Sequence, residues 1–143
     1  MLAATLSSTR WVLLDASQRR TAFLEAALEE LGLANGSVIR GRAEEVARRP
    51  DLRHVFDAVV ARGFGPPSLT AECAAGFLAV GGRLVVSEPP DGASDRWPGE
   101  ALAGLGLAVG ARTGSPAHFQ VLHAQEVCSE RYPRRAPHKR PLF

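Results

Sequence analysis

Short apolar runs alternate with amphipathic segments along most of the chain, and this alternation restricts the fold more than any other feature. Trp11-Val-Leu-Leu-Asp15 is an apolar run that ends in an acid, as a strand buried on both faces often does. Further strands are expected at residues 37–40, 56–61 and 83–87. Strands of this kind, each followed by a helical segment, predict an α/β fold in which helices cover both faces of a doubly wound sheet.

The first of these helices has the clearest boundaries. Ser17 can cap its start, and Gly32 can end it because glycine accepts the left-handed conformation. Its apolar stripe is expected to contain Phe23, Leu24, Ala27, Leu28 and Leu31. Other helical segments are expected at residues 43–49, 68–78 and 100–105. Residues 107–111 and 118–123 predict a C-terminal antiparallel hairpin joined through residues 113–116.

Composition is that of a single globular domain. The chain has 143 residues, of which 45% are hydrophobic and 22% charged, which is enough to form one core. No apolar run approaches the roughly 18 residues that a membrane-spanning helix needs, and we expect no signal peptide. The two cysteines, Cys73 and Cys128, lack the spacing of zinc sites or disulfide frameworks. We therefore expect no metal, no membrane contact and a cytoplasmic location.

Charge is divided unevenly along the chain. Residues 1–130 hold 12 of the 17 basic residues and all 15 acidic ones, a net charge of −3. The net charge of +5 at the C-terminus comes from Arg131, Arg134, Arg135, Lys139 and Arg140. We expect a domain over residues 1–126 and an extended basic tail over residues 127–143 that suits contact with phosphate. A solvated terminus that only keeps the protein soluble would carry the same charge.

Three features fall at the carboxyl ends of expected strands, where open α/β sheets bind ligands. Asp15 can accept hydrogen bonds from both ribose hydroxyls of a nucleoside, but capping the next helix explains it equally well. Gly41-Arg-Ala-Glu-Glu45 can present backbone groups to an adenine edge, although taken alone it fits better as a helix start with acids at its positive end. Arg62, held in a Gly/Pro loop, is placed to meet a carboxylate or phosphate.

Two more side chains stand near these ends. Phe64 can stack on a base or anchor its loop in the core, and the second role is the commoner one for phenylalanine. Glu88 ends the expected strand at residues 83–87, where a substrate contact and a loop anchor are equally plausible. The sequence has no G-x-S-x-G, Walker A or H-E-x-x-H motif.

Several motifs in one order resemble the RsmG (GidB) family of 16S rRNA guanine-N7 methyltransferases. Residues 11–15 with Gln18-Arg-Arg-x-x-Phe-Leu24 resemble the family's second strand and the helix after it. The turn at residues 41–45 resembles its adenine-contacting turn. Residues 56–64 resemble its fourth-strand motif, which usually reads Ala-Arg-Ala-Phe or Ala-Arg-Ser-Phe. Gly81-Gly-Arg-Leu84 matches the turn into its fifth strand, and the tail resembles its basic C-terminal signature.

The resemblance implies a class I, Rossmann-like methyltransferase that transfers a methyl group from S-adenosylmethionine to guanine N7 in the 16S rRNA of the small ribosomal subunit. Asp15 would hold the cofactor ribose, and Ala43 and Glu44 would flank the adenine. Arg62 would line the cofactor and guanine pocket, and the five basic tail residues would contact rRNA phosphate. Guanine N7 carries an available lone pair and needs no deprotonation, so we expect no dedicated catalytic base.

The sequence departs from the family at its N-terminal end, at position 63 and in the tail, where a glycine-containing stretch expected between Arg135 and Pro137 is reduced to Ala136. The family's first strand and its Gly-x-Gly-x-Gly loop would precede Met1, and position 63 is glycine where alanine or serine is usual. That first strand is the central one, so the strands at 11–15 and 56–61 must pair directly, keep open edges or be bridged by a partner. The glycines of that loop let the protein backbone approach the methionine half of the cofactor closely, because they carry no side chain. We therefore predict weak S-adenosylmethionine binding and impaired or absent methyl transfer by this chain.

Two other functions fit the same residues. One is a non-catalytic α/β module derived from the family, whose tail binds RNA or a protein. The other is a methyltransferase of the same fold that acts on a small molecule, with the tail incidental. RNA binding that weakens with salt and on neutralising Arg134 and Arg135 would favour the RNA functions over the small-molecule one.

Overall fold

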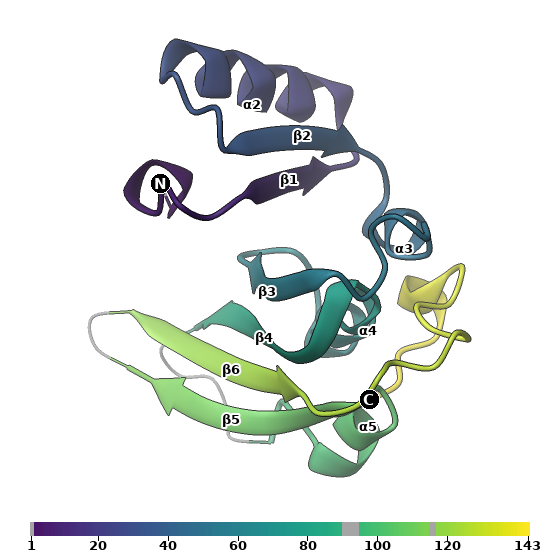
Figure 1. Ribbon diagram of the computed structural model, residues 1–143. Helices are drawn as coiled ribbons and strands as arrows, with labels where there is room; N and C mark the ends of the chain where they lie inside the picture. The colour runs from purple at the N-terminus through teal and green to yellow at the C-terminus, as the bar shows by residue number, and fades with distance from the viewer. Residues whose placement is uncertain (1, 90–94, 115–116) are drawn as a thin grey trace. The chain divides into compact units, whose positions relative to one another are not determined.

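The strands of the computed structural model form two sheets, one in each of the two units into which the chain divides, Met1–Val46 and Ala47–Phe143. The structure describes residues 2–89, 95–114 and 117–143. Figure 1 shows the order of the elements from the purple N-terminus to the yellow C-terminus. Strands and helices alternate as the sequence predicts, until a C-terminal hairpin ends the sheet of the second unit.

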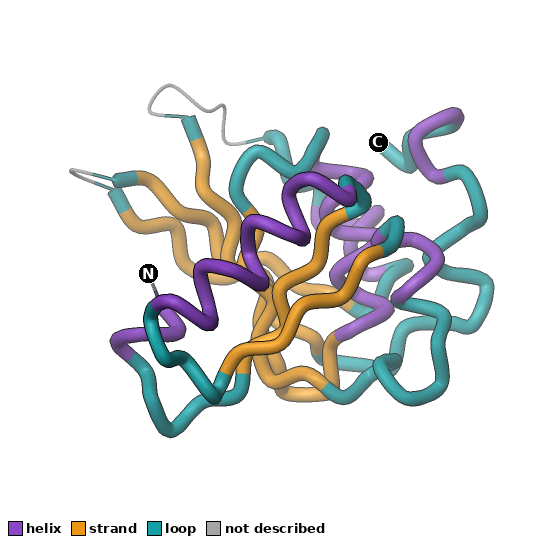
Figure 2. Tube along the Cα trace, turned by 90° about the horizontal axis from the view of Figure 1, so that it is seen from above, coloured by secondary structure: helices purple, strands orange, loops and turns teal. Residues whose placement is uncertain are grey.

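The first unit is a β-α-β arrangement with two short helices. Its elements, in chain order, are α1 (Leu2–Thr5), β1 (Trp11–Asp15), α2 (Gln18–Glu30), β2 (Gly36–Arg40) and α3 (Ala43–Val46). β1 and β2 are parallel, in register from Trp11 opposite Gly36 to Asp15 opposite Arg40. The helix α2 packs against both strands, and Figure 2 shows it in purple alongside them. The carboxyl ends of both strands therefore lie at one edge.

The boundaries of α2 confirm the capping prediction, whereas its apolar stripe is partly wrong. The Ser17 hydroxyl accepts a hydrogen bond from the Arg20 N–H at 3.4 Å, and Gly32 follows the helix with a φ of 62°. Phe23, however, is 71% exposed and Leu31 is 55% exposed. Thr21 is buried in their place. Leu24, Ala27 and Leu28 are half-buried as the predicted stripe requires, so the stripe is wrong only at Phe23 and Leu31.

The second unit is a mixed four-stranded sheet with helices. Its elements, in chain order, are β3 (Phe56–Ala61), α4 (Pro67–Phe77), β4 (Leu78–Glu88), α5 (Gly99–Ala103), β5 (Leu107–Thr113), β6 (His118–Ala124) and the 3-10 turn η1 (Pro137–Lys139). The strand order is β3-β4-β6-β5, with β3 and β4 parallel and the remaining pairs antiparallel. This confirms the C-terminal hairpin, whose predicted turn falls partly outside the described residues.

Strand β4 begins five residues earlier than predicted. The sequence suggests a turn at Gly81-Gly82, yet both residues lie inside the strand. Gly81 has a φ of 85°, and a Cβ on Gly82 would lie only 3.0 Å from the carbonyl oxygen of Phe56 and 3.1 Å from that of Asp57. The two glycines therefore let β4 pass close to β3 where the register of the pair shifts.

The core of the second unit lies between α4, α5 and the sheet. Its largest fully buried side chains are leucines at positions 78, 84, 102, 105 and 122, each of which stabilises the fold by about 1.5–3 kcal/mol. α4 meets them with small residues, since Ala71, Ala74 and Ala75 are all 3% exposed or less. This close packing fixes the carboxyl ends of β3 and β4, where the loops that matter for function begin.

Strands β1 and β3 do not pair with each other in the described part of the chain. β1 pairs with β2 alone, and β3 with β4 alone. Each of the two strands keeps one backbone edge without a strand partner among the described residues.

Candidate active site

Asp15 holds the start of α2 with its carboxylate. Oδ1 accepts a hydrogen bond from the Ser17 N–H and Oδ2 accepts one from Arg20 Nε, both at 2.7 Å. The hydrogen bond from the Arg20 guanidinium lowers the pKa of Asp15, with the Ser17 N–H as the second cause. Asp15 thus holds the turn that leads into α2, whereas the N-cap itself is Ser17. It leaves room for a ligand, because the side chain is 26% exposed and each carboxylate oxygen has a second lone pair.

The turn after β2 lies beside Asp15. The Gly41 N–H donates to the Asp15 carbonyl oxygen at 3.0 Å, which joins the carboxyl ends of the two strands. Ala43 and Glu44 follow in α3 and are 7% and 5% exposed. The Glu44 carboxylate accepts a hydrogen bond from Arg42 Nε at 2.7 Å. Three of the four predicted cofactor contacts therefore come together in one unit, at adjacent strand ends.

A pocket opens at the carboxyl ends of the parallel strands β3 and β4 in the second unit. Its volume is about 210 Å³. It is lined by Ala61, Gly63, Phe64, Gly65, Pro67, Thr70, Val86, Ser87, Glu88, Pro89, Arg96 and Trp97. Phe64 is 46% exposed, so it does not anchor its loop in the core as a phenylalanine usually would. Arg62 is exposed between two lining residues, but its own side chain is not part of the lining.

The loop that shapes this pocket explains the glycine at position 63. Gly63 has a φ of 59°, in the left-handed region that alanine and serine adopt only with strain. A Cβ there would meet nothing within 4 Å. Glycine is therefore favoured at this position by its backbone conformation, since an added Cβ would meet no steric obstacle.

Glu88 is the most enclosed charged group of the pocket. Its side chain is 3% exposed, Oε1 accepts a hydrogen bond from Trp97 Nε1 at 3.2 Å, and Oε2 pairs with Arg96 Nη1 at 3.0 Å. Sequence reasoning identified Glu88 from its strand-end position but missed Trp97 and Arg96. No motif marks these two, which follow a proline-rich break and meet Glu88 only through folding.

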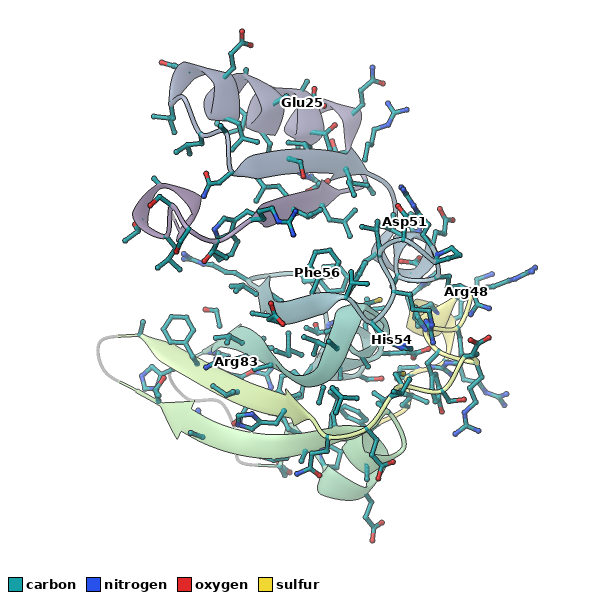
Figure 3. All side chains as sticks on the ribbon, in the orientation of Figure 1. Glu25, Arg48, Asp51, His54, Phe56 and Arg83 are labelled. Atoms are coloured by element: carbon teal, nitrogen blue, oxygen red, sulfur yellow. The ribbon has the colours of Figure 1, made fainter. Side chains whose placement is uncertain are left out.

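The C-terminal segment is held against the second unit by two arginines. Arg53 donates to the carbonyl oxygens of Tyr132 at 2.8 Å, Ala47 and Ser129 at 3.2 Å, and Cys128 at 3.3 Å. Arg48 donates to the Pro133 carbonyl oxygen at 2.8 Å, and Figure 3 shows its side chain beside the yellow tail. Residues 127–143, predicted as an extended tail, thus follow a fixed course over their own unit.

The basic residues of the tail have different environments. Arg134 donates from its backbone N–H and from Nε to Oε1 of the buried Glu72, and from Nη2 to Oε2. The Arg131 guanidinium lies 4.7 Å from the centre of the Tyr132 ring. Arg131, Arg135, Lys139 and Arg140 are exposed and form no ion pair with the described residues. Four of the five predicted phosphate contacts therefore remain accessible, and the fifth anchors the tail.

Other kinds of site find no support among residues 2–89, 95–114 and 117–143. No three His, Cys, Asp or Glu side chains there are grouped as metal ligands. No helix in the same ranges has the length and hydropathy needed to cross a membrane.

Comparison with solved structures identifies the fold. A SAM dependent methyltransferase from Aquifex aeolicus superposes with a TM-score of 0.61 at 16% identity, covering 85% of this chain and 77% of that one. An rRNA methylase from Streptococcus thermophilus gives a TM-score of 0.57 at 19% identity, covering 86% and 79%. These likenesses show the class I methyltransferase fold.

Comparison with known sequences identifies the family. The family profile described as rRNA small subunit methyltransferase G matches residues 1–88. Proteins named ribosomal RNA small subunit methyltransferase G are 33% identical in Deinococcus deserti, over 99% of this chain and 62% of that protein, and 32% identical in Leuconostoc citreum, over 91% and 58%. The chain spans about three-fifths of the length of these relatives. The chain therefore belongs to the rRNA small subunit methyltransferase G (GidB) family.

Proposed function

We propose that the protein carries out S-adenosylmethionine-dependent methylation of guanine N7 in the 16S rRNA of the small ribosomal subunit, in the cytoplasm, and that this chain by itself binds the cofactor weakly and transfers the methyl group slowly. The observation that carries the proposal is the junction of Asp15 with the Gly41 turn, within a chain of this family. It brings an accessible carboxylate and the turn before Ala43 and Glu44 to adjacent strand ends, where α/β folds bind nucleosides.

The residues of the first unit suit the adenosine half of the cofactor. The free lone pairs of the Asp15 carboxylate can accept hydrogen bonds from the two ribose hydroxyls, and Arg20 keeps that carboxylate ionised and oriented. Ala43 and Glu44 can flank the adenine from fixed positions, because both are buried and the Glu44 carboxylate is paired with Arg42. When bound, S-adenosylmethionine supplies an electrophilic methyl group on its sulfonium sulfur.

The residues of the second unit suit the guanine. Phe64 presents an exposed ring at the pocket, and unstacked RNA bases bind by stacking on such rings. Arg62 stands next to the pocket with its charge exposed, where it can meet the phosphate or the ribose of the target nucleotide. Since N7 needs no deprotonation, holding the base in position is the main task of these residues.

The docked tail suits the RNA backbone. The contacts of Arg48, Arg53 and Glu72 hold its backbone in place, so Arg131, Arg135, Lys139 and Arg140 present their charges from a fixed segment. A fixed array loses less conformational entropy on binding phosphate than a free tail would. We assign the Arg134 side chain the role of holding the tail, and its contribution to RNA binding acts through that role.

A non-catalytic RNA- or protein-binding module of the same family is the alternative. The anchoring of the tail favours it, because the contacts of Arg48, Arg53 and Glu72 with the tail all lie within the second unit. RNA binding by the tail therefore does not depend on an intact cofactor site.

The two functions are separated by measuring cofactor and RNA binding on the same protein. Labelled S-adenosylmethionine is crosslinked to the 143-residue chain by ultraviolet light, with 16S rRNA present. The catalytic proposal expects crosslinking that falls in Asp15→Ala and persists in Asp51→Ala, an exposed aspartate paired with Arg49. RNA binding is expected to weaken with salt, and replacing Arg135, Lys139 and Arg140 by glutamine should lower the log–log slope by about 0.7–0.9 per residue. No specific crosslinking alongside salt-dependent RNA binding would support the non-catalytic module.

A further inference from the structure

We propose that Glu88 selects guanine by accepting hydrogen bonds from its N1–H and N2–H groups. The inference rests on the proposed function, because it assigns a specificity-determining residue to the base pocket at the ends of β3 and β4. It begins from the buried carboxylate, which lines that pocket and which the methyl transfer itself does not use.

The carboxylate is fixed before any base arrives. Trp97 Nε1 donates to one oxygen and Arg96 Nη1 to the other, at 3.2 and 3.0 Å. Each oxygen keeps one more lone-pair direction, so a ligand can add two hydrogen bonds without displacing either partner. The Arg96 guanidinium balances the charge of the carboxylate, so a neutral ligand with two donors fits this site better than a cation.

The pocket has the size and walls for one base. Its volume of about 210 Å³ is below the range of about 300–1,000 Å³ typical of drug-sized ligands. The Phe64 ring is half exposed at the pocket and Trp97 forms part of its wall. Aromatic faces for stacking, with a polar group placed to meet a base edge, are the combination by which proteins bind single unstacked bases.

Among the four RNA bases, guanine alone offers two neighbouring donors on its Watson–Crick edge. Adenine and cytosine place an acceptor beside their amino groups, and uracil places its one donor between two carbonyl oxygens. Any of these would set an acceptor against the Glu88 carboxylate, which is a repulsive contact in a buried site. Binding the Watson–Crick edge also leaves N7, on the opposite edge of guanine, free to receive the methyl group.

The test is a titration of the 143-residue protein with nucleoside monophosphates, followed by NMR at the Trp97 indole N–H. The indole signals of Trp11 and Trp97 are distinguished with a Trp11→Phe variant. Wild-type protein is expected to bind GMP about tenfold or more tightly than AMP, as a bidentate base contact implies. IMP, which lacks the N2 amino group, should bind with intermediate affinity. In Glu88→Gln the ratio of AMP to GMP dissociation constants should approach one, and Glu100→Gln, which changes an exposed carboxylate on α5, should keep it.

The ligand series needs no variant, so it tests the inference even where Glu88→Gln fails to fold. Equal binding of GMP and AMP, no GMP-induced shift at Trp97, or an unchanged preference in a folded Glu88→Gln would each overturn the inference. None of these readouts involves methyl transfer. If Glu88→Gln loses the preference for guanine but the wild-type protein transfers no methyl group, the role of Glu88 is supported and the catalytic proposal fails. If the wild-type protein methylates N7 but Glu88→Gln keeps the preference, the catalytic proposal is supported and the role of Glu88 is refuted.

Discussion

The carboxylate of Glu72, which has no exposed surface, accepts three hydrogen bonds from Arg134. They come from the backbone N–H at 2.6 Å, Nη2 at 2.7 Å and Nε at 2.9 Å. A residue whose charge suggests an RNA contact is thus the anchor that joins the tail to α4. The contact has a clear energetic consequence, because an unpaired charge inside a protein is strongly unfavourable.

Replacing Glu72 by glutamine should destabilise the second unit. The amide keeps the shape of the side chain but loses its charge and offers only one acceptor oxygen to Arg134. The expected loss in urea denaturation is about 3 kcal/mol, at the low end for a broken buried pair because Arg134 can still reach water. Glu29→Gln changes an exposed carboxylate on α2 and should leave the midpoint almost unchanged. Equal midpoints for the two variants would show that the pair does not hold the tail.

Arg53 and Arg49 form a matched pair for testing the second anchor. Arg53 donates to four backbone carbonyl oxygens, three of them in the segment 128–132, whereas Arg49 pairs only with the exposed Asp51. Arg53→Lys cannot reproduce the planar fork and should cost about 1–3 kcal/mol. Arg49→Lys should leave the midpoint almost unchanged, because exposed ion pairs contribute little to stability. Thermal or urea unfolding measures both, and a larger effect at Arg49 would refute the assignment.

Cys128 reports whether the tail stays docked. Burial raises the pKa of its thiol to about 11, so at pH 8 only about one molecule in a thousand carries the reactive thiolate. Alkylation of the native protein should therefore be slow at Cys128 and fast after unfolding. Glu72→Gln should speed it more at Cys128 than at Cys73 in α4, as read by peptide mass spectrometry. Equal acceleration at both cysteines would indicate global unfolding instead of release of the tail.

Acid should weaken the start of α2 through Asp15. Its pKa is lowered mainly by the hydrogen bond from Arg20, so the folded state holds this proton less tightly than the unfolded chain does. The stabilisation is complete above the ordinary value of 3.8 and is lost as the pH falls through the lower folded value. In Arg20→Gln, NMR titration of the carboxyl carbon should give a higher pKa for Asp15, while Arg19→Gln should not. An unchanged titration in Arg20→Gln would contradict the pairing.

The local elements of this fold could be predicted because their signals lie within a few residues. Asp15, Ser17 and Gly32 mark the end of a strand and both ends of a helix, and the structure places all three as expected. Sequence also placed Phe56–Ala61 at its observed bounds, because a run of apolar residues there is closed by glycines and prolines. Such signals depend on backbone conformation and hydrophobic period, which a single sequence contains.

Contacts between distant segments could not be predicted in the same way. Glu72 and Arg134 are 62 positions apart, and neither residue has a neighbour in sequence that marks it as paired. The sequence predicts a phosphate contact for Arg134 because the local charge of the tail does not reveal the buried Glu72 carboxylate that Arg134 meets. Phe23 and Phe64 are likewise exposed because no other described element covers them, and the hydrophobic period of a sequence does not show which residues other elements will cover.

Identifying the methylated nucleoside shows directly whether this protein methylates guanine N7. The 143-residue protein is incubated with labelled S-adenosylmethionine and 16S rRNA lacking the modification, and the RNA is digested to nucleosides. We predict slow labelling that is confined to 7-methylguanosine and is lost in Asp15→Ala. Label in any other nucleoside, or equal labelling by wild type and Asp15→Ala, would contradict it.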